Sequence, residues 1–588
     1  MRLLNIFTIV AIAASITSCK KDVLEQIPQT NIRDDDYWKS TNDLKLYCNN
    51  FYNNYLPYFG GYGTIGIYGL DADQGSDNMI TMSYNKVLNG ETTLPASASS
   101  AGWNWDALRN INHFFDNYNK VNAPQENINP YVGEALFFRA YIYFSMLRYF
   151  GDLPWISKEL DPNSSDLYNE RLPRNIIVDS MLQDLDNAIA FLPSKTKQEP
   201  SRINKEIAML LQARIALYEG TWEKYHAGTD FGVKGSDGSM YLNKAASVAD
   251  ALINLNVYTL DNMASGTSTG YWQLFNRTDY SGSGEVMLWR KFDKSLGITH
   301  NWHRYTNSGA GRGLTKNLVD AYLCTDGKPI SVSQLYKGDD SLRSVVINRD
   351  PRLVQTIYVN DSNHVITSNQ PSGQPNKVFT VPAFDQANEG KPATGYQVYK
   401  GHNPDYYQQY AGDQGTTGCI LYRYAEALLI LAEAKAELGT ITQADVDKTI
   451  NLLRARVGMP SLIISSITPD PKWEFPELSG IINEVRRERR VELACEGYRH
   501  DDVFRWAAAG KLIKGWQPQG AKKAQWTATV PDNLLVSYPV DANGYIVLYK
   551  NLSPMANGYQ FNVNRDYLAP MPTNEIQLNP KLKQNPGW

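Results

Sequence analysis

The chain has 588 residues, enough for a large core, and its length alone allows roughly one to four domains. With 43% hydrophobic and 20% charged residues, its composition argues against disorder, and a net charge of −4 with mixed signs argues against a nucleic-acid-binding protein. Aromatic residues make up 12% of the chain and include 37 Tyr, as in proteins that present rings to ligands and in large loop-rich domains.

The N-terminus has the features of a secretory signal peptide. An apolar run over residues 3–16 ends in small residues and Cys19, and it is too short to span a bilayer. A Cys at the cleavage point resembles the lipobox of bacterial lipoproteins, although Ile16 stands where Leu is usual. We therefore expect a signal peptide over residues 1–18, a lipid anchor at Cys19 and a tether over residues 19–33. The alternative is an ordinary signal peptide followed by an unrelated Cys.

Periodic hydrophobic residues predict helices in two separate parts of the chain. Small residues and a central Gly439 in residues 424–458 predict a helical hairpin of about the length of a tetratricopeptide unit. We therefore expect a mostly α fold built of tetratricopeptide-like hairpins, the alternative being helical hairpins without true repeat geometry. The expected helices cover residues 34–56, 104–121, 132–150, 176–192, 207–218, 242–255, 421–438 and 445–457, with a polar insertion over residues 220–239.

The middle of the chain interrupts the helical parts. It has no sustained helical period and is rich in Gly, Ser, Asn, Asp, Tyr and Trp, which predicts loops and short strands. An interruption inside the repeats favours one domain with interleaved parts. We expect a single domain over residues 34–588, with helical repeats over 34–260 and 419–512, an irregular ligand-side part over 261–418 and a turn-rich end over 513–588.

One stretch, residues 481–510, combines an apolar stripe with many charges. Ile481, Ile482, Val485 and Leu493 follow helical spacing, but the stripe then meets glutamates and arginines. We expect Gly497 to end this helix, and Asp501 or Asp502 to cap a second helix over residues 503–509.

The charges of this stretch have two interpretations. Glycoside hydrolysis needs two carboxyl groups facing each other across an open cleft, whereas successive helical turns place them on one wall. Nearby arginines also make paired glutamates poor general acids. We favour a structural ion network over a glycosidase site. Its members are Glu488, Arg489, Glu492, Glu496, Arg499 and Arg505.

Other chemical motifs are weak. The Gly-x-Ser-x-Gly string at residues 266–270 lacks a preceding hydrophobic strand, and His300 and His303 have no acidic or Cys partner beside them. Asp71, Asp73 and Asp77 resemble a calcium loop, but Gly75 is misplaced. The sequence predicts no catalytic residue, metal or cofactor, although a loop-stabilising ion stays open. Four further cysteines form no CxxC pair and leave disulfides open: Cys48, Cys324, Cys419 and Cys495.

Several segments together resemble the SusD/RagB family of starch-utilisation-type lipoproteins. They are Cys19, RAYIYFSMLRYFGDLPW, RYAEALLILAEAKAELG, ERRVELACEGYRHDDVFRW and the closing LAPMPTNEIQLNPKLKQNPGW, in that order. The resemblance covers nearly the whole mature chain. It implies a non-enzymatic lipoprotein on the outer face of the outer membrane. Such a protein captures oligosaccharides and passes them to a TonB-dependent, SusC-like transporter. The alternative is a helical-repeat scaffold that binds a protein or peptide.

A sugar site needs exposed rings beside polar donors and acceptors. Two loop regions have this mixture, one over residues 62–84 and one over residues 272–305. A single ring more often fills a core than contacts a ligand, so the regions are predicted more firmly than the residues. The candidate ligand-binding residues are Tyr68, Asp77, Asn78, Tyr84, Trp272, Tyr280, Trp289, Trp302, Arg304 and Tyr305. The glycan, its linkage and the stoichiometry with the transporter stay open.

Overall fold

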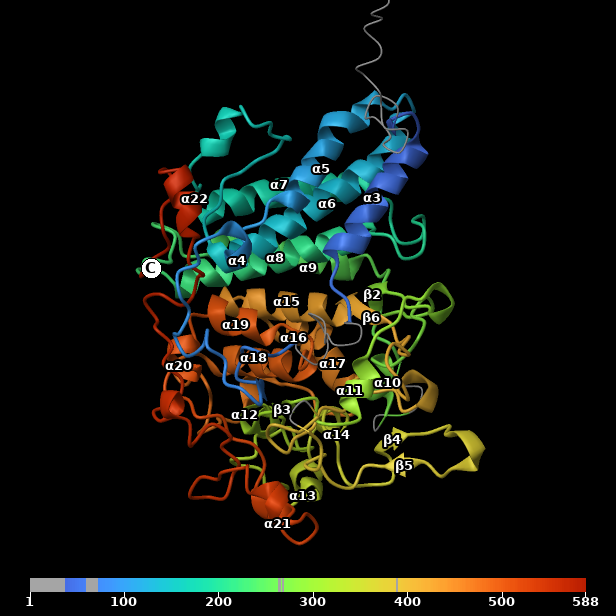
Figure 1. The fold of residues 1–588 in the computed structure, drawn as a ribbon, viewed down its shortest axis with the longest axis vertical. Helices are drawn as coiled ribbons and strands as arrows, with labels where there is room; N and C mark the ends of the chain where they lie inside the picture. Colours follow the sequence, from blue (N-terminus) through green and yellow to red (C-terminus); the bar gives the residue numbers. More distant parts are fainter. Residues whose placement is uncertain (1–36, 60–71, 263–265, 267–268, 388–389) are drawn as a thin grey trace, which may run out of the picture.

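The computed structural model describes residues 37–59, 72–262, 266, 269–387 and 390–588 (Figure 1). The predicted anchor Cys19 and the candidate Tyr68 lie outside these residues. Within the described part of the chain, none of the helices has both the length and the hydropathy needed to cross a membrane.

Long helices form the upper half of the molecule in Figure 1. Consecutive helices pack on one another, α6 on α7, α7 on α8 and α8 on α9. These helices are α3 (Thr41–Tyr55), α5 (Asp106–Asn117), α6 (Gln125–Phe150), α7 (Arg174–Phe191), α8 (Lys205–Tyr225) and α9 (Ser239–Asn254). The predicted start of the polar insertion, at residue 220, is wrong, because α8 continues to Tyr225. Gly220 is a packing residue there: a Cβ on it would lie 2.8 Å from the side chain of Leu242 in α9.

A second group of helices lies below the first, and α15 packs against both α9 and α18. These are α15 (Tyr424–Glu437), α16 (Gln443–Lys448), α17 (Ile450–Arg456), α18 (Gly480–Glu492) and α19 (Arg499–Arg505). The single helix expected over residues 445–457 is divided at Thr449, where ψ is −88°. The hydroxyl of Thr449 donates to the carbonyl of Asp445 at 2.6 Å, a local bond that competes with the helical pattern. The mostly α, tetratricopeptide-like fold predicted from the sequence is confirmed.

The turn between α18 and α19 differs from the prediction. Helix α18 ends at Glu492, before Gly497, and the turn contains two left-handed residues, Cys495 (φ 64°) and Gly497 (φ 87°). The predicted cap by Asp501 or Asp502 is also wrong, because both lie in the first turn of α19. The carboxylate of Asp502 accepts hydrogen bonds from arginine side chains instead.

Among the described residues, the strands form three two-stranded antiparallel pairs, two between segments distant in the sequence and one within a hairpin. Strand β1 (Met79–Thr81) pairs with β3 (Arg312–Leu314), β2 (Val286–Arg290) with β6 (Cys419–Arg423), and β4 (Val365–Thr367) with β5 (Lys377–Val378). Because β6 leads directly into α15, the β2–β6 pair joins the irregular part to the second group of helices. The short helices around these strands are α10 (Gly270–Leu274), α11 (Trp302–Thr306), α12 (Lys316–Ala321), α13 (Leu342–Val346) and α14 (Pro351–Val354).

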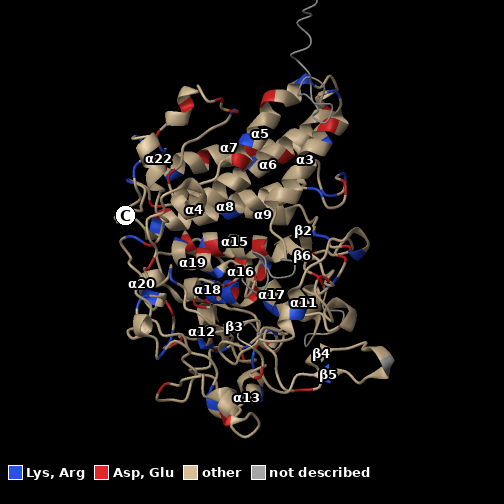
Figure 2. Ribbon diagram, in the orientation of Figure 1, with Lys and Arg blue, Asp and Glu red and all other residues tan. Residues whose placement is uncertain are grey.

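The C-terminal part runs along one side of the molecule, from α21 (Asp532–Leu535) at the lower end to α22 (Thr573–Leu578) at the upper end, near α4 (Ala98–Ala101) and α7 (Figure 1). Before it lies α20 (Ala509–Leu512). Charged residues concentrate on α15, α18 and α19 in the middle of the molecule (Figure 2). The candidate ligand side is the edge opposite the C-terminal part, on the right in Figure 1. It holds β2, β6, α10, α11 and the β4–β5 hairpin.

Candidate ligand-binding site

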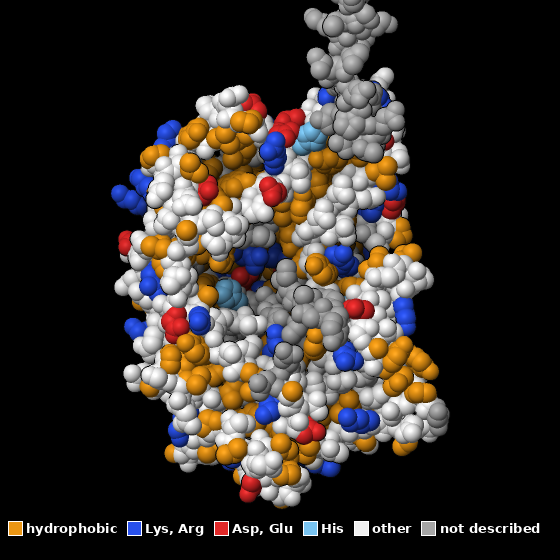
Figure 3. All heavy atoms as spheres, viewed as in Figure 1, with side chains coloured by type: hydrophobic (Ala, Val, Ile, Leu, Met, Phe, Trp, Pro, Cys, Tyr) orange, Lys and Arg blue, Asp and Glu red, His pale blue; other side chains and the backbone are white. Residues whose placement is uncertain are grey.

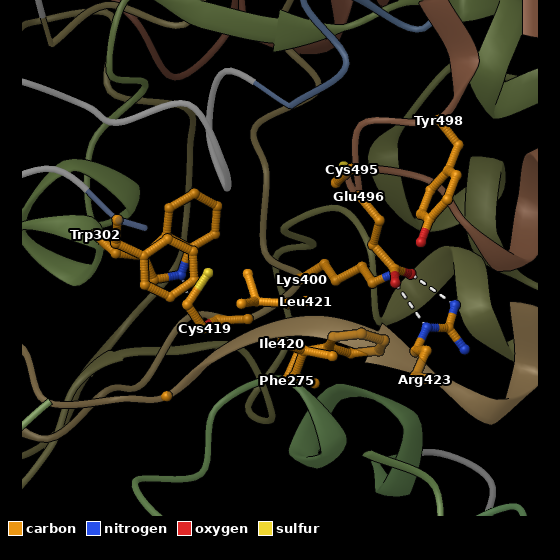
Figure 4. A pocket seen from close by; sticks show the side chains of 13 residues that line it. Phe275, Trp302, Lys400, Cys419, Ile420, Leu421, Arg423, Cys495, Glu496 and Tyr498 are labelled. Carbon is orange, nitrogen blue, oxygen red and sulfur yellow. Dashed lines mark hydrogen bonds and ion pairs between the residues drawn. The ribbon is translucent and has the colours of Figure 1, made fainter. Parts of the chain in front are cut away.

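A small pocket lies where β6, α11 and the α18–α19 turn meet (Figure 4). Trp302 closes one side, with its indole stacked 5.3 Å from Phe59 and its Nε1 donating to the carbonyl of Gly401 at 2.9 Å. On the other side Lys400 donates to Glu496 at 2.7 Å, and Glu496 also pairs with Arg423. The free volume is about 60 Å³, whereas sites for small molecules occupy about 300–1,000 Å³. This pocket is too small for a saccharide.

The predicted ion network reaches the wall of this pocket at Glu496, and its other five members are buried. Glu488 pairs with Arg352 at 2.6 Å and with Arg454 at 2.8 Å, and Glu492 pairs with Arg423 at 2.7 Å. Arg489 pairs with Asp502 across the α18–α19 turn (2.9 Å), Arg505 pairs with Glu433 of α15 (2.6 Å) and Arg499 pairs with Asp77 (2.6 Å). All six predicted members therefore form ion pairs, including partners that lie far away in the sequence.

The electrostatics of Glu492 do not suit general acid catalysis. Burial by itself would raise the pKa of Glu492, but Arg456, Arg423 and Arg352 outweigh it and hold this pKa well below its usual range. A carboxylate held ionised and saturated with guanidinium donors has no proton to give a leaving group.

Two candidates of the first predicted loop region, Asp77 and Asn78, belong to the same buried network. Asp77 is fully buried, and although burial would raise its pKa, Arg490 and Arg499 lower that pKa to about 2. Asn78 is also buried, and its Oδ1 accepts from Arg490 at 2.7 Å. Both side chains are occupied inside the protein, so we leave them out of the proposed ligand surface. Tyr84 is half-buried and donates to Glu91 at 3.0 Å.

The calcium-like loop and the histidine pair have other partners. The carboxylate of Asp73 accepts from the backbone N–H groups of Cys495 (2.9 Å) and Gly497 (3.0 Å), so it fastens the α18–α19 turn. Nε2 of His300 and Nε2 of His303 contact the Thr417 carbonyl and hydroxyl oxygens, at 2.9 and 2.6 Å. Among the described residues, His, Cys, Asp and Glu form no group of three that could hold a metal. Residues 267 and 268 of the Gly-x-Ser-x-Gly string lie outside the described chain.

Of the six candidates in the second predicted loop region, two are buried in the core and four are half-buried. Tyr280 is 2% exposed and Trp302 is 6% exposed, so both rings are core residues. Trp272 stacks 5.1 Å from Tyr399, and Trp289 contacts Tyr280 edge to face. Trp272, Trp289, Arg304 and Tyr305 are half-buried and remain candidates for ligand contact.

The loop of residues 403–416 carries a cluster of three tyrosines, two of them exposed, that was not among the residues predicted from the sequence. Tyr406 and Tyr410 stack 5.0 Å apart, and Tyr407 meets both edge to face. Tyr407 is 55% and Tyr410 is 46% exposed, so two rings of one loop face the solvent. We call these three residues the tyrosine cluster. Its signal was present in the segment NPDYYQQYAGDQ, where three Tyr stand among Asp, Asn and Gln.

The loop that carries the tyrosine cluster is fastened from several sides. Asn301 donates to Asp413 at 2.8 Å, and the backbone of His300 pairs with that of Gly415. Nδ1 of His303 accepts from the N–H of Asn403, and Nε2 of His402 donates to the carbonyl of Ile366 at 2.8 Å. The cluster is therefore held in place by buried polar groups, which is what a rigid contact surface requires.

A groove of about 450 Å³ lies beside this loop. Asn307 lines the groove and donates to Gln409 of the tyrosine loop at 3.1 Å, and the backbone of Tyr406 pairs with Ser368, next to the groove residue Thr367. The buried Gln397, whose Oε1 lacks a hydrogen-bond partner in the described chain, also lines it. In contrast to the pocket at Trp302, this volume falls in the range of ligand sites.

The fold and this polar, aromatic edge define a tetratricopeptide-like helical protein with an irregular part attached. Comparison with protein families then identifies it further. The model of the SusD family matches residues 267–588, and the model described as starch-binding associating with outer membrane matches residues 72–217. The first match alone covers more than half of the chain, and the chain belongs to the SusD/RagB family.

Individual relatives agree with this assignment. SusD-like protein P2 of Formosa agariphila is 24% identical and aligns over 99% of both chains, and SusD-like protein P38 of the same organism is 22% identical over 87% of this chain and 92% of its own. A SusD-like carbohydrate binding protein from Bacteroides fragilis superposes with a TM-score of 0.72 at 20% identity, over 93% of this chain and all of that one. A laminarin binding SusD-like protein superposes with a TM-score of 0.57 at 17% identity, over 94% of this chain and all of that one. At these identities the structural matches show the shared fold.

Proposed function

We propose that this protein is a non-enzymatic, surface-exposed lipoprotein that binds oligosaccharides and passes them to a TonB-dependent outer-membrane transporter. The observation that carries the binding step is the tyrosine cluster beside the groove at Asn307. Family membership, the family description that mentions starch and the outer membrane, and the carbohydrate-binding relatives support it.

The chemistry of the surface fits a neutral sugar. The flat C–H face of a pyranose packs on an exposed phenol ring, while its hydroxyl groups need donors and acceptors such as Asn307, Gln386 and Gln397 around the groove. The groove residues include one cation, Lys377, and one anion, Asp385. A surface without an excess of either sign favours an uncharged ligand over an anionic or cationic one.

The binding step is tested with the Tyr407→Ala/Tyr410→Ala double variant and a panel of neutral glucans that includes starch and laminarin. We expect the glucan that binds the wild type to bind the variant at least about tenfold more weakly by calorimetry, because two ring contacts are lost. Tyr149→Ala is the matched control, since Tyr149 is 54% exposed and lines neither the groove nor the cluster. Unchanged glucan affinity in the double variant, or binding of peptides alone, contradicts the proposal.

The anchoring and transfer steps need cells. With Cys19→Ala we expect the protein to leave the outer-membrane fraction, because the acyl chains attached to that Cys supply the membrane affinity. Pull-down of the anchored protein is expected to recover a TonB-dependent transporter. Retention of the Cys19→Ala variant in the membrane in the absence of the transporter contradicts the anchor, and recovery of no transporter contradicts the transfer step.

A further inference from the structure

A second pocket lies at the other end of the molecule, among the residues before and within α5, the segment that follows α6, the short helix η3 (Ser165–Tyr168) and α22. Its free volume is about 420 Å³, close to that of the groove beside the tyrosine cluster. In Figure 1 α5 and α22 stand at the upper end, far from the β4–β5 hairpin at the lower right, so the two sites are separate.

Aromatic and apolar side chains form one part of this pocket. Trp105 is half-buried and contacts Trp103 edge to face at 5.2 Å. Tyr168 is 53% and Leu578 is 69% exposed at its rim. On the face shown in Figure 3, hydrophobic side chains gather at the upper left, over the η3 segment and α22. Exposed apolar groups gathered at a pocket indicate a binding surface.

Charged side chains around the pocket are already paired with each other. Arg109 donates to Glu159 at 3.1 Å, and Lys158 pairs with Asp166 at 2.8 Å. These pairs leave Asp106 and Glu575 as the other acidic groups in the lining, and no further basic residue lines the pocket. Two cationic and three anionic side chains therefore line the pocket, without a large excess of either sign, and its flat rings suit an uncharged ligand with an apolar face.

Asn112, which lines the pocket, has an acceptor atom without a partner in the described chain. Its Nδ2 donates to the carbonyls of Ile156 (3.0 Å) and Lys158 (3.2 Å), which determines the orientation of the amide. Its Oδ1 then has no hydrogen-bond partner in the described chain, although the residue is only 1% exposed and lines the pocket. A buried acceptor without a donor is unfavourable, and a hydroxyl group is a donor that satisfies it.

We propose that this pocket is a second carbohydrate-binding site, one that holds a neutral saccharide against Trp105 and Tyr168. A pyranose combines the three features that the pocket requires: an apolar face, no charge and hydroxyl donors. An acyl chain has no donor for Asn112. The ligand class of this second site rests on the proposed function. The residues that form the site are different ones.

Calorimetry with maltohexaose, laminarihexaose and cellohexaose on the full mature protein tests this second site. We expect the hexaose that binds to show two sites on the wild type, one of which weakens by at least about tenfold in Tyr168→Ala and in Trp105→Ala. Trp105→Phe keeps a ring and is expected to restore most of that affinity, which separates stacking from a folding defect. Tyr149→Ala again serves as the control.

The outcomes separate the two proposals. A single site that is abolished by Tyr407→Ala/Tyr410→Ala and is unchanged in Tyr168→Ala and Trp105→Ala overturns the second site and leaves the proposed function intact. A single site that is lost only in Trp105→Ala and Tyr168→Ala supports the second site and removes the tyrosine cluster as the binding surface. Hexaose binding that is insensitive to Trp105 and Tyr168, together with transporter recovery that needs them, overturns the inference and marks the pocket as a docking surface.

Discussion

At the scale of single residues, the glutamates and arginines of α18 illustrate how position decides chemistry. The same Glu488 that suggests a catalytic carboxylate in the sequence is 2% exposed and held between Arg352 and Arg454. Removing one partner of a buried pair leaves an uncompensated charge, which is far more costly than loss of a surface pair.

Glu488→Ala and Arg489→Ala are therefore expected to lower the free energy of unfolding by about 3–5 kcal/mol each, without a change in glucan specificity. Urea unfolding measures the first effect and calorimetry of the folded variants the second. Lys511→Ala is the control, because its side chain is 43% exposed and its pair with Glu477 is worth at most about 1 kcal/mol. A variant that keeps wild-type stability but no longer binds glucan contradicts a structural role.

Buried histidines make stability depend on pH. Burial lowers the pKa of His300 and of His402 to about 4, whereas an unfolded His has a pKa of about 6.5. Between these values the unfolded chain binds a proton that the folded chain does not. The free energy of unfolding therefore falls as the pH decreases from 6.5 to 4, by at most about 3 kcal/mol per histidine.

We expect His402→Gln to reduce this pH dependence, because Gln keeps a donor and an acceptor but does not titrate in this range. Urea unfolding at pH 7.5, 6.5, 5.5 and 4.5 compares the two proteins, and the difference between their slopes removes the contribution of the carboxylates. Parallel curves for the wild type and the variant would falsify the assignment of the slope to His402.

At the scale of elements, the loop of residues 403–416 has no regular structure beyond one 3-10 turn, yet many side chains order it. Gln409 is 3% exposed, and its Nε2 donates to the carbonyls of Ile366 (2.8 Å) and Pro404 (2.9 Å). A loop ordered by a few buried groups opens locally when one of them is removed.

Gln409→Ala is expected to increase amide hydrogen exchange across residues 403–416 and to weaken glucan binding several-fold, with exchange in α6, α8 and α15 unchanged. The reason is the loss of about 1–3 kcal/mol of local hydrogen bonding. Gln125→Ala, on the exposed first turn of α6, is the control. Rapid exchange of the loop with full glucan affinity would show that rigidity of the tyrosine cluster is not needed.

At the scale of the whole molecule, the irregular part and the helical part share one buried network. Arg352, from α14, pairs with Glu488 and Glu492 of α18, and β2 pairs with β6 ahead of α15. We propose that contacts of this kind couple the unfolding of the two parts, as expected of the single interleaved domain that the sequence predicts.

Calorimetry of the mature protein is accordingly expected to show one cooperative unfolding transition. Arg352→Ala should move the whole transition to lower temperature, because it leaves two glutamates unpaired in the interior. Two separate transitions, only one of which moves in Arg352→Ala, would instead indicate two domains over the helical and irregular parts.

The sequence alone determined the features that depend on local spacing. Helical periods, small residues in residues 424–458 and the segments shared with the SusD family led to the helical-repeat fold, and charges on an apolar stripe led to the ion network. Tertiary structure alone decided which of 37 Tyr are exposed, and which partners close the network: Arg352 lies 136 residues from Glu488, and Asp77 lies 422 from Arg499. The physical reason is that burial and ion pairing depend on segments brought together by packing, whereas a period along the chain reports only the local backbone.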